Sequence, residues 1–299
     1  MVKILPTLRQ LRYLVALAEH RHFGRAAETC LATQSTLSAG LQELENLLGV
    51  TLVERTKRKV MLTPLGEEVV ARARVVLRGA EDITDLAAAS AEPLSGPLRL
   101  GVIPTIGPYL LPRVLPSLRQ AYPNLRLYLR EDLTARLLER LSSGDLDAVL
   151  IALPYDSAEM ESMVVGEDPF MLACPPGHAL AAKSEIDSAD LVDCELLLLE
   201  EGHCLREHAL AACRLPGPAK GDGIMGTSLA TLVQMVANGL GVTLLPQMAV
   251  QCGVLAGTDL VTRPLAEAGN RLIGLAWRPS SPRKAEFRAL GEFLSCWRR

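Results

Sequence analysis

Residues 11–67 read LRYLVALAEHRHFGRAAETCLATQSTLSAGLQELENLLGVTLVERTKRKVMLTPLGE. Apolar residues recur at helical spacing in and just before this stretch, which predicts helices over 7–22, 24–31 and 34–48. Thr7 and Gln10 fit a capping box at the first helix, and Gly49 ends the third. The alternating residues 51–62 predict a β-wing. This order is that of a winged helix-turn-helix, whose second motif helix enters the major groove of DNA.

The start of the predicted helix 34–48 carries short polar and amide side chains suited to base edges and phosphates, namely Gln34, Ser35, Thr36, Ser38 and Gln42. The wing carries a basic cluster that would meet phosphates or the minor groove, namely Arg55, Lys57, Arg58 and Lys59. The alternative is a polar helix start followed by a solvated run of charges. We expect these residues to bind DNA because they occur together with the whole helix pattern.

The charge of the chain is unevenly distributed. The 299 residues have a net charge of -3, which disfavours a uniformly basic nucleic-acid coat or a polybasic membrane surface. Residues 1–64 nevertheless hold nine Lys/Arg against five Glu, a net of +4, so the remainder sums to -7. A basic N-terminal module on an acidic body is the layout expected of a DNA-binding regulator.

The apolar pattern and the cysteines of the chain also indicate the cellular compartment in which the protein works. No apolar run reaches the ~18 residues of a membrane span, and the N-terminus lacks the order of a signal peptide, so we expect a cytoplasmic protein without membrane contact. The seven cysteines are odd in number and irregularly spaced, unlike a secreted disulfide scaffold. Any disulfide would then be transient or sensory.

The rest of the chain predicts a linker and a two-part α/β body. Residues 64–92 predict one long linker helix, and the Pro/Gly-rich residues 93–97 predict a hinge. Strand-like segments occur at 98–103, 125–131, 148–153, 195–200, 241–246 and 272–277, and helical patterns lie between them at 108–121, 133–143 and 227–238. This alternation predicts α/β subdomains with largely parallel sheets in residues 98–299.

The conspicuous segment of the body is Leu199-Glu-Glu-Gly-His-Cys-Leu-Arg-Glu-His-Ala-Leu-Ala-Ala-Cys213. Cys204 is predicted at the start of a helix, where the positive helix terminus favours a thiolate, and Arg206 or His203 would add to that effect. A thiolate attacks peroxide bonds, and the resulting sulfenic acid condenses with a second thiol. Cys213 is the candidate second thiol. A helix over 204–213 would separate the two Cα atoms by roughly 13 Å, whereas a disulfide needs about 4.4–6.8 Å, so bond formation requires unwinding.

Two other interpretations of this segment stay open. A metal site is conceivable because Cys204 and His208 are spaced i, i+4 with His203 beside them, although no partner cluster is evident. Alternatively, the thiols are inert core residues, which is what we expect of the remaining cysteines, Cys30, Cys174, Cys194, Cys252 and Cys296.

The N-terminal motifs F-x-R-A-A, Q-S-T-L-S, L-E-x-x-L-G-V and L-x-E-R occur in order and resemble the winged helix-turn-helix of LysR-type transcriptional regulators. The resemblance covers the whole chain. It implies a DNA-binding domain over 1–63, a dimerisation helix over 64–92, a hinge over 93–97 and a regulatory domain over 98–299. This last domain would be periplasmic-binding-protein-like, with lobe I at about 98–167 and 272–299 and lobe II at about 168–271.

Within this family, the segment E-x-G-H-C-L-R with a second cysteine in C-x8-C spacing is similar to the hydrogen-peroxide-sensing OxyR branch. GVIPTIGPYLLP over 101–112 and the T-S-L-x-T-L segment starting at 227 are similar too. This resemblance implies that Cys204 is the peroxidatic and Cys213 the resolving cysteine, and it gives four residues roles in holding peroxide or activating the thiol: Thr105, Thr134, His203 and Arg271. Gly223-Ile224 departs from the His-Phe that relatives often carry.

The sequence therefore predicts a peroxide-sensing transcription factor, not an enzyme, which needs no cofactor or metal. The expected partners are promoter double-stranded DNA, hydrogen peroxide, RNA polymerase, further copies in a homodimer or homotetramer, and a glutaredoxin- or thioredoxin-type reductant. The alternative is a LysR-type regulator that binds a small metabolite between the lobes, for which Cys204 would be dispensable. A thiol peroxidase is disfavoured because the sequence has no C-x-x-C or cofactor loop, and because an enzyme would have no use for the basic N-terminal DNA-binding module.

Overall fold

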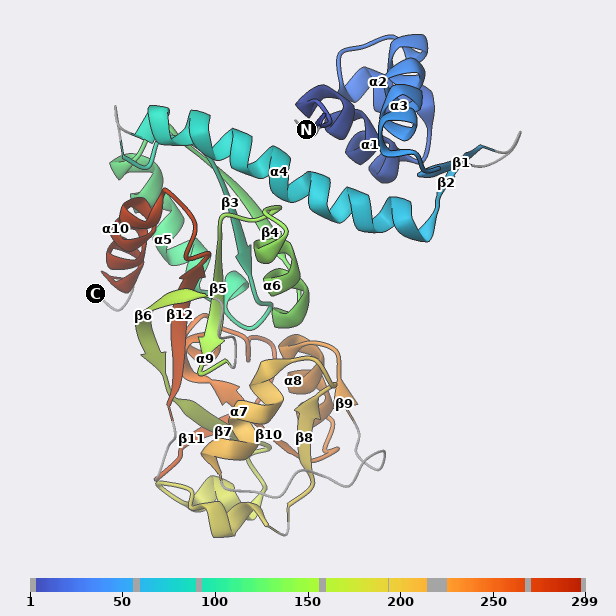
Figure 1. Ribbon diagram of the computed structural model, residues 1–299. Coiled ribbons are helices and arrows are strands. Elements are labelled where there is room, and N and C mark those ends of the chain that lie inside the picture. The colour runs from blue at the N-terminus through green and yellow to red at the C-terminus, as the bar shows by residue number, and fades with distance from the viewer. Residues whose placement is uncertain are drawn as a thin grey trace. The chain divides into compact units, whose positions relative to one another are not determined.

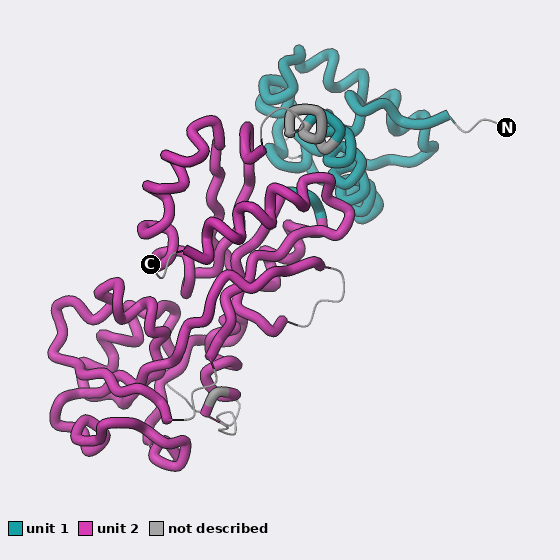
Figure 2. The backbone as a smooth tube through the Cα atoms, turned by 90° about the vertical axis from the view of Figure 1, so that its left-hand side faces the viewer, with its two compact units in different colours: residues 1–91, 143–145 teal, residues 92–142, 146–299 magenta. Residues whose placement is uncertain are grey.

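The computed structural model describes residues 4–55, 60–89, 93–155, 160–192, 194–213, 225–266 and 270–296. The chain divides into two compact units, residues 1–91 with 143–145, and residues 92–142 with 146–299 (Figure 2). No helix within these described ranges is both long and apolar enough to cross a membrane.

The first unit is a winged helix-turn-helix followed by a long helix (Figure 1). Its elements are α1 (Leu8–His20), α2 (Phe23–Thr29), α3 (Gln34–Leu48), β1 (Val53–Arg55), β2 (Val60–Leu62) and α4 (Pro64–Ala89). A core of leucine, alanine and valine side chains joins α1, α2 and α3 to the wing and the first turns of α4. The predicted fold class of this part is confirmed.

Local capping explains why the helix boundaries follow the sequence closely. Thr7 and Gln10 form the predicted capping box at α1. The hydroxyl of Thr33 accepts the backbone N–H of Thr36 at the start of α3, and Gly49 ends this helix with φ +70°, a left-handed conformation that favours glycine. The start and end of α3 are those predicted.

The wing is held to the end of α3 by one carboxylate. Glu45 Oε1 accepts the backbone N–H groups of Leu52 at 2.8 Å and of Val53 at 3.0 Å. β1 and β2 then pair antiparallel, which confirms the predicted wing. Three of its basic residues, Lys57, Arg58 and Lys59, lie outside the described residues, as does the side chain of Arg55.

Lobe I of the second unit surrounds a five-stranded sheet of order β4-β3-β5-β12-β6 among the described strands. Its elements are β3 (Gly96–Val102), α5 (Gly107–Ala121), β4 (Leu125–Glu131), α6 (Thr134–Ser142), β5 (Ala148–Leu153), β6 (Glu161–Asp168), β12 (Arg271–Trp277) and α10 (Lys284–Ser295). Helix α6 packs on β5, and α10 packs on β6 and β12 (Figure 1).

Lobe II surrounds a second five-stranded sheet, of order β11-β7-β10-β8-β9 among the described strands. Its elements are β7 (Phe170–Cys174), two 3-10 turns (Ala179–Ala182 and Ser188–Leu191), β8 (Leu196–Leu199), α7 (Cys204–Ala212), β9 (Met225–Gly226), α8 (Leu229–Ala237), β10 (Val242–Pro246), α9 (Gln247–Gln251) and β11 (Val261–Pro264). The two lobes confirm the predicted two-lobed α/β fold.

The expectation of largely parallel sheets is wrong. In lobe I, β3 pairs parallel with β4 and β5, but β12 pairs antiparallel with both β5 and β6. In lobe II, β7 pairs antiparallel with β10 and β11. The reason is topological: the chain leaves lobe I after β6 and returns on β12, so each sheet contains strands that run against its βαβ units.

Part of the predicted hinge segment, residues 93–97, contacts lobe I of the regulatory unit. Leu94 is buried in the core of lobe I, and its N–H donates to Glu286 at 3.1 Å. The carbonyl of Pro97 accepts from Arg283 at 2.9 Å, and β3 already starts at Gly96. The hinge at 93–97 stays a prediction.

One glycine at the start of α4 offers a test of the first unit. A Cβ at Gly66 would collide with the carbonyl oxygen of Leu52, whereas a Cβ at Gly79 in the same helix would meet nothing within 4 Å. We expect Gly66→Ala to lower the free energy of unfolding by ~1–3 kcal/mol through overpacking. Gly79→Ala should raise it by up to ~1 kcal/mol because alanine favours helix. Urea denaturation of both variants checks this, and equal effects would contradict it.

Candidate redox site

A short turn places Cys204 at the start of α7. After β8, Gly202 adopts φ +96°, a conformation that favours glycine, and the N–H of His203 donates to the carbonyl of Glu200 at 3.4 Å. Cys204 is thereby the first residue of the helix, as predicted. Its thiol lies at the positive end of the helix dipole.

Cys204 lines a small cavity between the lobes of the regulatory unit. The cavity holds about 10 Å³ and is lined by Ile103, Pro104, Thr105, Leu133, Thr134, Gly202, His203, Cys204 and Leu205. Lobe I contributes the loop after β3 and the start of α6, and lobe II contributes the start of α7. A volume of this size is close to the ~10–15 Å³ that one water molecule needs. The site therefore suits a molecule of about the size of water.

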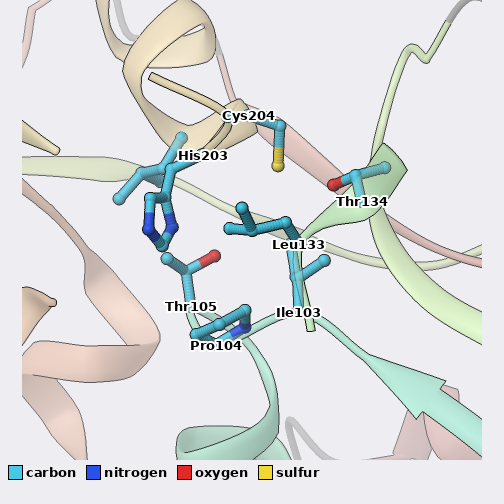
Figure 3. A pocket seen from close by; sticks show the side chains of 9 residues that line it. Ile103, Pro104, Thr105, Leu133, Thr134, His203 and Cys204 are labelled. Carbon is cyan, nitrogen blue, oxygen red and sulfur yellow. The ribbon is translucent and has the colours of Figure 1, made fainter. Parts of the chain in front are cut away.

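Thr134 presents an unsatisfied hydroxyl to this cavity. The residue is 2% exposed, and its Oγ1 has no hydrogen-bond partner among the described residues. Figure 3 shows this oxygen on the side of Thr134 that is turned toward Cys204. A buried hydroxyl without a partner costs roughly 1–3 kcal/mol, so a small ligand able to hydrogen-bond would be stabilised here.

Thr105 is held from behind by Arg271. Arg271 Nη1 donates to the hydroxyl of Thr105 at 2.9 Å, and Nη2 donates to its carbonyl at 2.8 Å. The same guanidinium pairs with Asp168 at 2.7 Å, and both side chains are buried. The predicted Arg271 thus reaches the site through Thr105 and carries a counter-charge. Asp168 was missed by sequence reasoning, because its partner lies 103 residues away and no local pattern marks the pair.

His203 also lines the cavity, and it is buried. Burial lowers the pKa of His203 below its ordinary value, and the carboxylate of Glu200, 4.0 Å away, opposes that shift. The imidazole is therefore neutral at neutral pH, when it can donate one hydrogen bond and accept one. The structure brings together Thr105, Thr134, His203 and Cys204 as the resemblance implies.

Cys213 lies apart from this cavity. It caps the end of α7 and is 2% exposed in the core of lobe II, whereas Cys204 packs with the core of lobe I. Burial raises the pKa of Cys213 to about 11, so its thiol is protonated at neutral pH. Both cysteines are free thiols. Since the intact α7 lies between them, the two sulfurs cannot bond in this arrangement.

Another side chain of α7 contacts lobe I. His208 Nε2 lies 3.3 Å from the carbonyl of Pro154, and burial lowers the pKa of the imidazole. The other ring nitrogen, Nδ1, is buried and has no hydrogen-bond partner among the described residues. The described residues hold no group of three or more His, Cys, Asp or Glu able to bind a metal ion.

The other cysteines differ from expectation in part. Cys174 is buried in the lobe II core, and burial raises its pKa. Cys30 and Cys194 are half-buried. Cys252 and Cys296 are exposed, so the expectation that they are buried core thiols is wrong. Each of the two stands at the C-cap of a surface helix, α9 or α10, where the helix end faces solvent.

The candidate DNA-binding face is formed by the start of α3. Gln34, Ser35, Thr36 and Gln42 are exposed, and Ser38 is half-buried. The hydroxyl of Thr33 contacts the hydroxyls of Ser35 and Thr36 at 2.9 and 2.7 Å, which ties these two side chains to the helix start. The amides of Gln34 and Gln42 are exposed on this face, and their binding to DNA stays a prediction.

Comparison with known families agrees with both units. Residues 8–67 match the bacterial regulatory helix-turn-helix protein, lysR family, and residues 91–298 match the LysR substrate binding domain. A winged reader joined to a two-lobed sensor is the architecture of this class. The chain belongs to the LysR family of bacterial transcriptional regulators.

Individual relatives narrow the assignment. The chain is 43% identical to the DNA-binding transcriptional dual regulator OxyR of Escherichia coli, over 96% of this chain and 94% of that protein. It is 45% identical to the HTH-type transcriptional regulator EstR of Acinetobacter baylyi, over 97% and 96%. A full-length OxyR variant from Pseudomonas aeruginosa has a TM-score of 0.81 at 42% identity, covering 98% of this chain and 96% of that one. The predicted resemblance to the OxyR branch is confirmed.

Thiol reactivity tests the two environments. In the reduced protein at pH 8, iodoacetamide should modify Cys204 much faster than Cys213, because Cys204 lines the cavity whereas Cys213 lies in the core of lobe II and is protonated. Reaction at Cys213 should rise only as the pH approaches its pKa of about 11. Peptide mass spectrometry measures each site, and the exposed Cys252 serves as the accessible control. Equal rates at Cys204 and Cys213 at pH 8 would contradict this arrangement.

Proposed function

We propose that this protein is a peroxide-responsive transcription factor in which Cys204 is the sensing thiol. The observation that carries the proposal is the thiol of Cys204 facing the buried, unpaired hydroxyl of Thr134 in a cavity of about 10 Å³. Hydrogen peroxide is a molecule of two oxygen atoms that donates and accepts hydrogen bonds. A cysteine-to-serine variant of OxyR from Corynebacterium glutamicum, with a TM-score of 0.68 at 35% identity to this chain, is a hydrogen-peroxide-bound structure.

The first chemical step would take place in the cavity. The thiolate sulfur of Cys204 attacks one peroxide oxygen, an S–O bond forms and the O–O bond breaks. Sulfur loses two electrons to become the sulfenic acid, and the departing hydroxide takes a proton and leaves as water. Thr105, Thr134 and His203 would hold the peroxide and donate to the departing oxygen.

The second step would couple the chemistry to shape. The thiol of Cys213 attacks the sulfenic sulfur of Cys204, so that an S–S bond forms and water leaves. The Cα atoms of the intact α7 are about 13 Å apart at these positions, whereas a disulfide needs less than about 7 Å. Helix α7 must therefore unwind and at least one thiol must leave its core. Residues 214–224, and with them Gly223-Ile224, lie outside the described residues.

The output would be altered binding to promoter DNA by paired reader domains. Helix α4 exposes several apolar side chains, Leu65, Val75, Val76 and Ile83, which suits dimerisation along this helix, and pairs of dimers would give a tetramer. The protein would act in the cytoplasm beside RNA polymerase, and a glutaredoxin- or thioredoxin-type reductant would restore both thiols. A regulator that senses a metabolite is less well supported, because it would leave the thiol of Cys204 and the unpaired hydroxyl of Thr134 in this cavity without a role.

Replacing the sensing thiol tests the proposal. Cys204→Ser should abolish the peroxide-dependent change in the footprint on a promoter fragment selected with the reduced protein, while the footprint of the reduced form persists. Cys252→Ser, which removes an exposed cysteine outside the site, should respond as the wild type does. DNase I footprinting before and after limited peroxide measures both. A normal response from Cys204→Ser would refute peroxide sensing at this thiol.

Two substitutions in the reader separate base contacts from phosphate contacts. Gln34→Ala should relax preference at particular base pairs by ~1–3 kcal/mol, because an exposed amide at the start of α3 is suited to base edges. Lys57→Ala should weaken binding on all sequences and reduce the salt slope by about one phosphate contact. Binding isotherms on matched and mismatched duplexes at several salt concentrations measure this. Identical losses on every duplex would contradict the assignment.

A further inference from the structure

We infer that Asp168 is a positioning residue of the peroxide site, which holds Arg271 against Thr105 and so directs the hydroxyl hydrogen of Thr105 into the cavity. The inference rests on the proposed function, since it assigns Asp168 a part in the first step of peroxide reduction. It also changes the part expected of Arg271.

The three side chains form one buried chain of contacts. Asp168 ends β6 and Arg271 starts β12, and the two are directly paired in the antiparallel ladder. Asp168 Oδ2 accepts from Arg271 Nη2 at 2.7 Å and from Nε at 3.1 Å. The remaining nitrogen, Nη1, donates to the hydroxyl of Thr105 at 2.9 Å. All three residues are at most 3% exposed, so solvent does not compete for these bonds.

The direction of these hydrogen bonds sets the polarity of the cavity. A guanidinium has only donors, so the hydroxyl of Thr105 accepts from Arg271 and keeps its own hydrogen for another partner. Thr105 lines the cavity, and Figure 3 shows its oxygen on the side that faces Leu133, with the sulfur of Cys204 beyond. An oxygen that leaves a peroxide gathers negative charge, which a pre-oriented donor stabilises. Arg271 thus orients a donor at the place where the reaction needs one.

The counter-charge limits what Arg271 does to the thiol. The guanidinium and the carboxylate are 2.7 Å apart and buried together, so their fields largely cancel beyond the pair. Arg271 therefore acts on Cys204 through Thr105. Loss of this hydrogen-bond network should lower the rate at which Cys204 reacts with peroxide more than it lowers the fraction of Cys204 present as thiolate. This difference separates a positioning role from an electrostatic one.

The second carboxylate oxygen of Asp168 explains why asparagine is the informative replacement. Asp168 Oδ1 accepts the N–H of Met248 at 2.9 Å, at the start of α9 in lobe II. In Asp168→Asn the amide oxygen keeps that contact and the NH₂ group faces the donors of Arg271. The shape of the side chain is preserved, while the bond that orients the guanidinium is lost.

The test compares two reactions of the same sulfur in the full-length Cys213→Ala background, where oxidation stops at the sulfenic acid. We expect Asp168→Asn to lower the rate of Cys204 oxidation by hydrogen peroxide at least tenfold. The rate of Cys204 alkylation by iodoacetamide, which needs thiolate and access but no oriented peroxide, should change less than about twofold. Peptide mass spectrometry reports both rates. The matched control is Asp147→Asn, another buried carboxylate of lobe I, which should leave the ratio of the two rates unchanged.

A double-mutant cycle shows whether Asp168 acts through Thr105. Thr105→Val combined with Asp168→Asn should be no slower with peroxide than Thr105→Val alone, because both remove one donor. If Asp168→Asn fails to fold, Arg271→Lys replaces it in the test. Lysine keeps the positive charge beside Asp168 but lacks the second nitrogen that donates to Thr105. This variant should lower the ratio of the peroxide rate to the alkylation rate.

Three results would overturn the inference: an unchanged peroxide rate in Asp168→Asn, an equal fall in both rates, or additive losses in the cycle. A failure of the proposed function looks different, because wild-type Cys204 would then not react with peroxide in preference to the exposed Cys252.

Discussion

Helix α7 has its first residue in one hydrophobic core and its C-cap in the other. Cys204 packs with lobe I and Cys213 with lobe II, so the helix acts as a spacer of about 13 Å between two thiols that lie within nine residues of each other in sequence. No small adjustment brings them to bonding distance. Burial in the core of lobe II keeps the thiol of Cys213 protonated. Cys213 must leave this core before it can attack Cys204, so disulfide formation is linked to a change of structure.

The cavity at Cys204 depends on how the lobes meet. Its walls come from the loop after β3, the start of α6 and the start of α7, three segments that are far apart in the sequence. The pair formed by Arg271 and Asp168 lies where the chain crosses between the lobes, and the carboxylate also caps the start of α9. One buried pair therefore connects the crossing strands, a lobe II helix and the hydroxyl of Thr105. A shift of one lobe against the other would change the site directly.

Prediction from sequence succeeded where the signals are local. Helix α3 has the predicted bounds because Thr33 caps its start and Gly49 allows the left-handed turn at its end. The strands β6, β7 and β11 escaped prediction, since β6 is an edge strand with only two buried residues and β11 has only four residues. The antiparallel direction of β12 was mispredicted because it is determined by the return of the chain from lobe II. The residues of β12 themselves carry no signal of that connection.

The sequence by itself determined the winged reader, the alternation of α and β elements, the position of Cys204 at a helix start and its helical distance from Cys213. Each of these follows from residues close together in the chain. Only the tertiary structure decided that Arg271 is neutralised by Asp168, that the hydroxyl of Thr134 is buried without a partner, and that the cavity holds about 10 Å³. These properties arise from side chains up to 166 residues apart, and their energies depend on burial and on the direction of each hydrogen bond. Neither quantity exists before the lobes have packed together.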